Sequence, residues 1–241
     1  MADWHLYLAS FLTAIVSGTI GMAGGVLLMS YMAVFFPPAI LIPLHGIVQL
    51  SSNLSRVALS FKNIVRDIAL ASFAGGIVGG LLGSQVVINL PEREFKILIA
   101  VVTIVLTWLP KLKSNIKIPG QFFFLGGIIT FLSLFIGAVG PLLAAFLVRN
   151  DLKRENLVAT QAACQAGTHF VKILVFFSLG FVIGPYLPIM IGMIAFGFLG
   201  NWVGKKLLNR IPTQKFTIAV KIVISLLAIK LFFDGLKLFE F

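Results

Sequence analysis

The stretch Ser-Gly-Thr-Ile-Gly-Met-Ala-Gly-Gly-Val-Leu at residues 17–27 has a counterpart, Ser-Leu-Phe-Ile-Gly-Ala-Val-Gly-Pro-Leu-Leu, at residues 133–143. Ser, Ile, two Gly and Leu occupy the same places in both. The same offset of 116 residues relates Gln49 to Gln165 and Phe61 to Phe177. A constant offset over this length indicates an internal duplication, in which each copy carries a glycine cluster inside an apolar stretch.

The composition is that of a membrane protein. Apolar residues make up 59% of the 241 residues and charged residues only 11%, whereas soluble domains are about 25% charged. The net charge of +11 does not indicate nucleic-acid binding, because the basic residues lie in short loops between apolar segments, where they set topology. The single cysteine, Cys164, excludes an internal disulfide and a thiolate metal site. The N-terminus lacks the basic region of a signal peptide, so we expect the first apolar segment to be retained.

Apolar segments follow one another along the whole chain. They cover residues 6–36, 44–61, 68–90, 95–109, 122–148, 157–177, 186–208 and 216–239. Most suit a membrane-spanning helix of about 20 residues. The first and fifth are interrupted near their middle by glycine clusters, leaving pieces too short to span alone, as in re-entrant hairpins or broken helices.

These segments predict an all-α polytopic membrane protein built from two four-segment repeats. The repeats cover residues 1–110 and 121–241, and a basic linker at 111–120 joins them. Plain long helices with a kink or a hydrophobic mismatch are the alternative for segments one and five.

Loop charges distinguish these topologies. If all eight segments cross, the loop Lys and Arg residues divide six to nine between the two sides, a poor positive-inside signal. If segments one and five turn back, twelve lie on one side and three, Arg93, Lys96 and Lys237, on the other. The uncharged pair Pro37-Pro38 also matches Lys153-Arg154 at the same offset. The charges therefore favour two inverted copies, each a hairpin plus three spans.

The glycine clusters are the first candidate binding residues. A helix that breaks inside a membrane leaves backbone groups that must face protein or a water-filled cavity, and N–H groups at a helix N-terminus bind anions. The alternative is close helix packing through small residues. Duplication of the cluster favours a binding site at Gly21, Gly24, Gly25, Gly137, Gly140 and Pro141.

A polar stripe on the second and sixth segments is the second candidate. Gln49, Asn53 and Arg56 are spaced to lie on one helical face, and Gln165, His169 and Lys172 repeat that face at the same offset. Cations and amide donors on two facing helices would form a cage for an oxyanion. The alternative for Arg56 and Lys172 is snorkelling to the membrane interface.

His45 and His169 are two histidines within the apolar segments. Either could carry a coupling proton, and the alternative is a structural hydrogen bond. His45 matches Gln161 at the offset of 116, so a proton role would not be duplicated.

Motifs of hydrolases and phosphate-binding loops are missing, so no enzyme is expected. A Ser17–His45 dyad in a membrane enzyme is a remote alternative, because the repeated Ser133 has no matching histidine. Cation transport is disfavoured by the lack of an evident intramembrane Asp or Glu.

The Gly21-Met-Ala-Gly24-Gly25 stretch, the polar second segment from His45 to Arg56 and the repeat resemble the TauE/SafE family of sulfite and organosulfonate exporters. The resemblance extends over nearly the whole chain. Met22, Ala23 and Pro141 depart from the family's glycine-rich pattern. The resemblance implies gradient-driven export of a sulfur-containing anion such as sulfite, sulfoacetate or thiosulfate.

We therefore expect a multi-pass secondary transporter of the cell membrane that moves a small sulfur-containing anion by alternating access, without a cofactor or metal. A channel-like anion facilitator is the alternative. A proton is the candidate coupling ion, the lipid bilayer is the medium, and a second copy of the chain, giving a homodimer, is a candidate partner. No nucleic-acid partner is expected.

Overall fold

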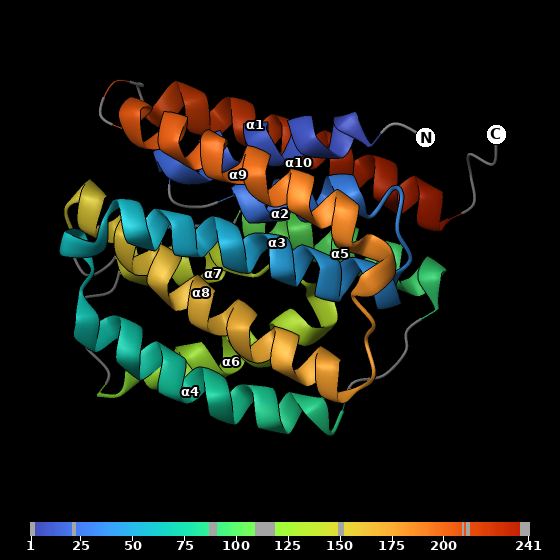
Figure 1. Cartoon of the computed structure of the whole chain (residues 1–241), viewed down its shortest axis with the longest axis horizontal. Helices are drawn as coiled ribbons and strands as arrows, with labels where there is room; N and C mark the ends of the chain where they lie inside the picture. Colours follow the sequence, from blue (N-terminus) through green and yellow to red (C-terminus); the bar gives the residue numbers. More distant parts are fainter. Residues whose placement is uncertain are drawn as a thin grey trace.

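The computed structural model describes residues 3–20, 23–86, 91–108, 119–148, 152–208, 210 and 213–236. Over these residues the chain is helical without strands, which confirms the all-α prediction. The α-helices are α1 (Trp4–Ile20), α2 (Gly24–Met32), α3 (Pro38–Leu59), α4 (Arg66–Ser84), α5 (Glu92–Thr107), α6 (Gln121–Ile136), α7 (Gly140–Val148), α8 (Arg154–Ser178), α9 (Leu187–Leu207) and α10 (Thr213–Gly235), with short 3₁₀ turns at Phe61–Asn63 and Gly184–Tyr186. They lie roughly side by side in one bundle (Figure 1).

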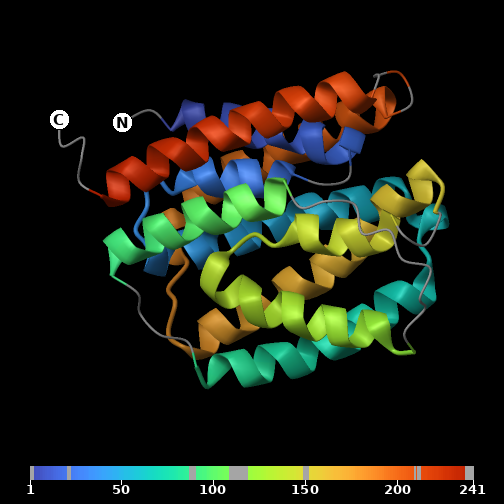
Figure 2. The same ribbon diagram turned by 180° about the vertical axis from the view of Figure 1, so that it is seen from behind.

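Both glycine-interrupted segments fold as antiparallel helix pairs. His5, at the start of α1, lies beside Tyr31, near the end of α2, with 3.2 Å between Nδ1 and the hydroxyl. A continuous helix would separate these residues by about 39 Å at 1.5 Å per residue, so the chain reverses at the break. Figure 2 shows the same reversal between α6 and α7, in yellow-green and yellow.

The two helices of each pair are unequal in length, a difference that the sequence pattern did not predict. α1 has 17 residues and α6 has 16, whereas α2 and α7 have 9 each. The first piece is thus close to the lower limit for a membrane crossing, about 17 residues. Only the second piece is a true half-helix.

Helix length and composition alone identify few membrane-spanning helices. Among the described residues, two stretches, Arg66–Ser84 and Gly184–Leu207, are long and apolar enough to cross a bilayer. The shorter apolar helices are Trp4–Ile20 and Gln121–Ile136. The prediction of eight membrane segments in two repeats is therefore not established by this criterion. α3 and α8 carry the polar stripes, which lower their average hydropathy although these polar side chains face inward.

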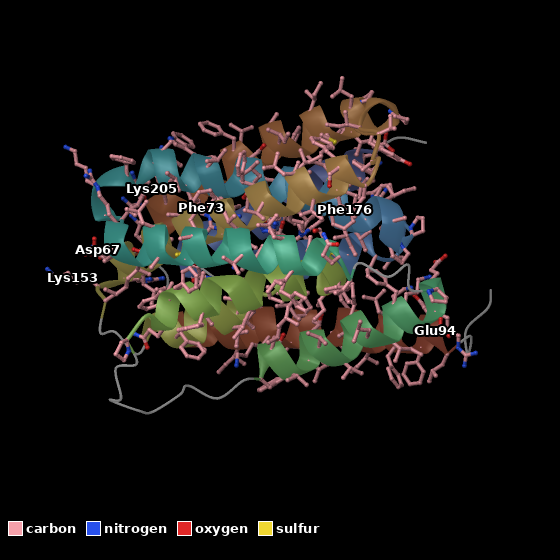
Figure 3. All side chains as sticks on the ribbon, turned by 90° about the horizontal axis from the view of Figure 1, so that it is seen from below. Asp67, Phe73, Glu94, Lys153, Phe176 and Lys205 are labelled. Atoms are coloured by element: carbon pink, nitrogen blue, oxygen red, sulfur yellow. The ribbon has the colours of Figure 1, made fainter. Side chains whose placement is uncertain are left out.

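The surface of the bundle is nevertheless apolar along its sides and charged at its ends. Large apolar side chains such as Leu70 and Val182 are about two-thirds exposed, at 67% and 68%. Figure 3 places Asp67 and Lys153 at one end of the bundle and Glu94 at the opposite end. Extensive exposed apolar surface marks a surface that meets lipid or another protein.

Helix packing in the two halves corresponds element by element. α1 packs on α9 and α6 packs on α4, while α3 packs on α8 and α5 on α10. Exchanging the first five helices for the last five, in order, interchanges the α1–α9 and α6–α4 contacts and maps the α3–α8 and α5–α10 contacts onto themselves. This set of four contacts is thus unchanged by the exchange.

In two of these contacts, glycines allow the backbones of the two helices to approach each other closely. A Cβ on Gly79 of α4 would lie 2.0 Å from the carbonyl oxygen of Gly127 in α6. A Cβ on Gly200 of α9 would lie 2.3 Å from the carbonyl oxygen of Phe11 in α1. Gly200 follows Gly79 by 121 residues, the offset that also relates Pro91 to Pro212, and Gly127 follows Phe11 by 116. The same close helix crossing therefore occurs twice.

We predict that Gly79→Leu and Gly200→Leu destabilise the protein, because the side chain would meet backbone that cannot move aside. Overpacking of this kind costs about 1–3 kcal/mol or more, measurable as a lower unfolding temperature of the purified protein in detergent. Gly184→Leu is the control, since nothing lies within 4 Å of a Cβ there. Equal unfolding temperatures for all three variants would contradict the packing described here.

Candidate functional site

A polar cavity lies where the N-terminal ends of α2 and α7 meet α3 and α8. The cavity is small, with a volume of about 30 Å³. It is lined by Ser17, Ala23, Gly25, Val26, His45, Gln49, Asn53, Arg56, Ala138, Gly140, Pro141, Gln161, Gln165 and His169. The lining combines residues of both halves of the chain.

The breaks in the first and fifth segments bring two helix N-termini to this cavity. Ala23, just before α2, has a φ of 74°, and Gly137, just after α6, has a φ of 83°, so the chain reverses through left-handed backbone at both places. The first N–H groups of a helix have no partner within it and carry partial positive charge. The first turns of α2, at Gly25, and of α7, at Gly140, therefore present an environment that favours an anion.

The opposite ends of the breaks, the carbonyl ends of α1 and α6, are occupied by cationic side chains. Arg56 Nη1 donates to the Ser17 carbonyl at 3.3 Å, and Lys172 Nζ donates to the Gly137 carbonyl at 3.0 Å. Arg154 Nη2 donates to the Thr19 carbonyl at 2.9 Å. These bonds satisfy carbonyl groups that a helix C-terminus leaves unpaired. They also place positive charge at the negative ends of the two helices.

Snorkelling of Arg56 and Lys172 to an interface is not what the structure shows. Arg56 is 6% exposed and Lys172 is fully buried, at 0%. Gly46 makes room for Lys172, because a Cβ there would lie 2.8 Å from Lys172 Cε. Arg56 also donates a hydrogen bond from Nη2 to Asn53 Oδ1.

The structure brings most of the predicted site residues together. Those that line the cavity are Gly25, Gln49, Asn53, Arg56, Gly140, Pro141, Gln165 and His169. Gly24, Gly137 and Lys172 do not line it. Gly24 instead packs against α1, where a Cβ added to Gly24 would lie 2.1 Å from Ser17 Oγ. The Lys172 ammonium donates its hydrogen bond to the Gly137 carbonyl. Gly21 lies outside the described residues.

Sequence reasoning did not assign Ser17, Gln161 or His45 to the binding site; it considered His45 as a proton carrier, with a structural hydrogen bond as the alternative. All three line the cavity. The signal was present for two of them, since His45 and Gln161 lie one turn before Gln49 and Gln165 on the same faces and match at the offset of 116. The polar stripe is thus one turn longer than predicted. Ser17 belongs to the repeated stretch itself.

Several buried polar atoms around the cavity have no hydrogen-bond partner within the described part of the protein. They are His45 Nδ1, Arg56 Nε, Gln161 Oε1, Gln165 Nε2 and His169 Nδ1. Buried polar groups are normally paired, and unpaired ones in native proteins call for an explanation. Their convergence on one cavity is typical of a site for a polar ligand. The rings of His45 and His169 also meet edge to face, with 5.9 Å between their centroids.

Comparison with known families adds an independent observation. The family model described as "Sulfite exporter TauE/SafE" matches residues 6–231 of the chain. No curated protein and no solved structure matches the chain significantly.

Asn201 of α9 holds the helix that carries Gln49, Asn53 and Arg56. Its Nδ2 lies 2.8 Å from the Ser52 carbonyl, 2.9 Å from Ser52 Oγ and 2.7 Å from Ser55 Oγ, at a position that is 0% exposed. The amide therefore fastens α9 to the back of α3.

We predict that Asn201→Leu lowers the free energy of unfolding by about 1–3 kcal/mol, the cost of leaving buried polar groups unpaired. Thermal unfolding in detergent measures this loss. Asn63→Leu, in the half-buried turn after α3, is the control and should change stability much less. Equal losses in the two variants would show that Asn201 does not brace α3.

Proposed function

Because the chain belongs to the sulfite exporter TauE/SafE family, we propose that it exports a small sulfur-containing anion across the cell membrane by alternating access around the cavity between α3 and α8. Membership of this family implies a membrane transporter of sulfite or related sulfur anions. The observation that carries the proposal is the convergence of two helix N-termini and a buried Arg56 on one polar cavity. No catalytic activity is proposed.

The charges and dipoles around the cavity support an anion rather than a cation as the ligand. Among the described residues, the side chains that line it include the guanidinium of Arg56 but no carboxylate. The carbonyl ends of α1 and α6 are already bonded to cationic side chains, so the N-terminal ends of α2 and α7 dominate the local field. In our proposal Gln49, Asn53, Gln165 and His169 orient the anion.

We propose that the two repeats are inverted in the membrane, each contributing a hairpin and three crossings. The helix directions support this arrangement. α3 and α8 run in opposite directions in Figure 1, as do the hairpins that precede them. The exchange symmetry of the helix contacts fits the same arrangement. Three crossings between the hairpins would place them on opposite sides of the membrane.

The equivalent cations of the two halves differ in whether they line the cavity, which supports alternating access. Arg56 lines the cavity, whereas Lys172, its equivalent in the second copy, is withdrawn against Gly137. Inverted repeats that hold different conformations can exchange them, and the exchange opens the site to the other side. In the proposed cycle Lys172 enters the cavity when Arg56 is withdrawn from it.

The proposed topology predicts the labelling of single cysteines placed in a Cys164→Ser background. Cysteines at Asp3 and Pro38 should react with a membrane-impermeant reagent from the same side, because the first hairpin returns the chain to its starting side. A cysteine at Lys62 should react from the opposite side. Labelling of Asp3 and Pro38 from opposite sides would refute the re-entrant hairpin.

Transport itself is tested in proteoliposomes with sulfite as the probe. We predict that Arg56→Gln weakens sulfite binding by about 10–100-fold, since charged hydrogen bonds contribute about 1.5–3 kcal/mol. Lys62→Gln, at an exposed turn, is the control and should retain wild-type affinity. Gradient-driven accumulation above the equilibrium level would distinguish a transporter from a channel-like facilitator. Unchanged affinity in Arg56→Gln would remove this residue from the site.

A further inference from the structure

The cavity contains hydrogen-bond acceptors as well as donors, and an anion alone cannot satisfy the acceptors. His45 provides the first. Its Nε2 lies 2.9 Å from the Gly25 carbonyl oxygen, which only accepts hydrogen bonds, so Nε2 carries the hydrogen. In the neutral ring the other nitrogen, Nδ1, is then an acceptor. It is buried and has no partner within the described residues.

Gln161 provides a second acceptor in the equivalent place. Its Nε2 donates to the Gly140 carbonyl at 3.3 Å, which leaves Oε1 as an acceptor without a partner in the described structure. His45 and Gln161 are related by the offset of 116 residues, and each donates to the first turn of a half-helix. A histidine and a glutamine at equivalent positions therefore each donate one hydrogen bond to a half-helix and keep one unpaired acceptor at the cavity.

The donors are found on the same two helices. Arg56 Nε and Gln165 Nε2 are buried, line the cavity and lack partners within the described residues. A ligand that pairs with these donors and with either acceptor must accept at some of its atoms and donate from at least one. Sulfate and thiosulfate, fully ionised near neutral pH, have only acceptors, and their oxygens would face the lone pairs of His45 Nδ1 and Gln161 Oε1.

We infer that the site selects a monoprotonated oxyanion, of which hydrogen sulfite is the member that fits the proposed function. Its single O–H is accepted by His45 Nδ1 or by Gln161 Oε1, which makes these two residues the specificity-determining ones. This inference rests on the proposed function and adds the protonation state of the substrate. A site built to hydrogen-bond an O–H group discriminates strongly against analogues that lack it, because its buried polar atoms are then left unpaired.

The inference places the proton on the bound anion. The alternative is that His45 carries this proton. The titratable and charged groups that face it are His169, with ring centroids 5.9 Å apart, Lys172, which packs on the neighbouring Gly46, and Arg56 along the same face of α3. A proton on His45 would join this cationic group, whereas a proton on the ligand adds no charge to the protein. The two locations predict different pH dependence for different anions.

The experiment measures dissociation constants of the full-length protein in detergent by calorimetry between about pH 5 and 8. Its probes are sulfite, sulfate and methanesulfonate, the last being a monoanion without an O–H. We expect sulfite to bind about tenfold or more tightly at the acidic end than at the alkaline end, and to bind there more tightly than methanesulfonate by a similar factor. Sulfate affinity should stay flat, because its charge does not change over this range.

Variants at position 45 separate the two locations of the proton. His45→Gln places there the residue that the second copy already uses, so it should keep both the pH dependence and the preference for sulfite. His45→Leu and Gln161→Leu each remove one acceptor and should narrow the preference over methanesulfonate. The unfolding temperature of each variant verifies its fold.

Each other outcome overturns the inference. Loss of pH dependence in His45→Gln, or a rise in sulfate affinity at acidic pH as large as that of sulfite, would place the proton on the protein. Equal affinities for sulfite and methanesulfonate would show that the O–H is not recognised. Failure of the wild-type protein to bind any of the three anions would refute the proposed function itself, and the inference with it.

Discussion

The structure depends on how a membrane helix can be interrupted without leaving its backbone unpaired. Inside a bilayer an unsatisfied N–H or C=O group is costly, so a break must be compensated by protein groups or a polar cavity. Here the two sides of each break are treated differently. The carbonyl ends of α1 and α6 are bonded by Arg56 and Lys172, whereas the N–H ends of α2 and α7 face the cavity. The need to satisfy the backbone thus produces a site with a defined charge preference.

Close helix packing supports this arrangement from outside. The breaks are held by α3 and α8, and the longer helix of each hairpin is clamped by a glycine-rich helix of the other half, α9 on α1 and α4 on α6. Gly79 and Gly200 allow carbonyl groups to approach where any side chain would collide. In lipid, where burial of apolar surface does not drive helix association, such backbone proximity is a principal source of packing energy. The cavity is consequently set by helix packing between the halves together with the hydrogen bonds to the breaks within each half.

The helix breaks and the polar stripes could be predicted from the sequence because each occurs in both copies of the duplicated unit. The offset of 116 identified the paired breaks and the facing polar stripes, and the structure places Gln49 and Gln165 together as expected. The unequal lengths of the hairpin helices were missed, because glycine spacing marks the break but not where the second helix ends. The lack of contact between Lys172 and the cavity was also missed. Equivalent sequence positions do not reveal which copy holds which conformation.

The difference between Arg56, which lines the cavity, and Lys172, which does not, is informative about the site. Arg56 and Lys172 occupy equivalent positions and both donate to the carbonyl end of the first helix of their own repeat. An arginine presents several N–H groups in a fixed plane, so Arg56 can bond Ser17 and Asn53 while its Nε remains available. The single ammonium of Lys172 is a compact point charge already engaged by Gly137. In the conformation described here, Arg56 thus keeps an N–H group free at the cavity, while Lys172 neutralises the carbonyl end of α6.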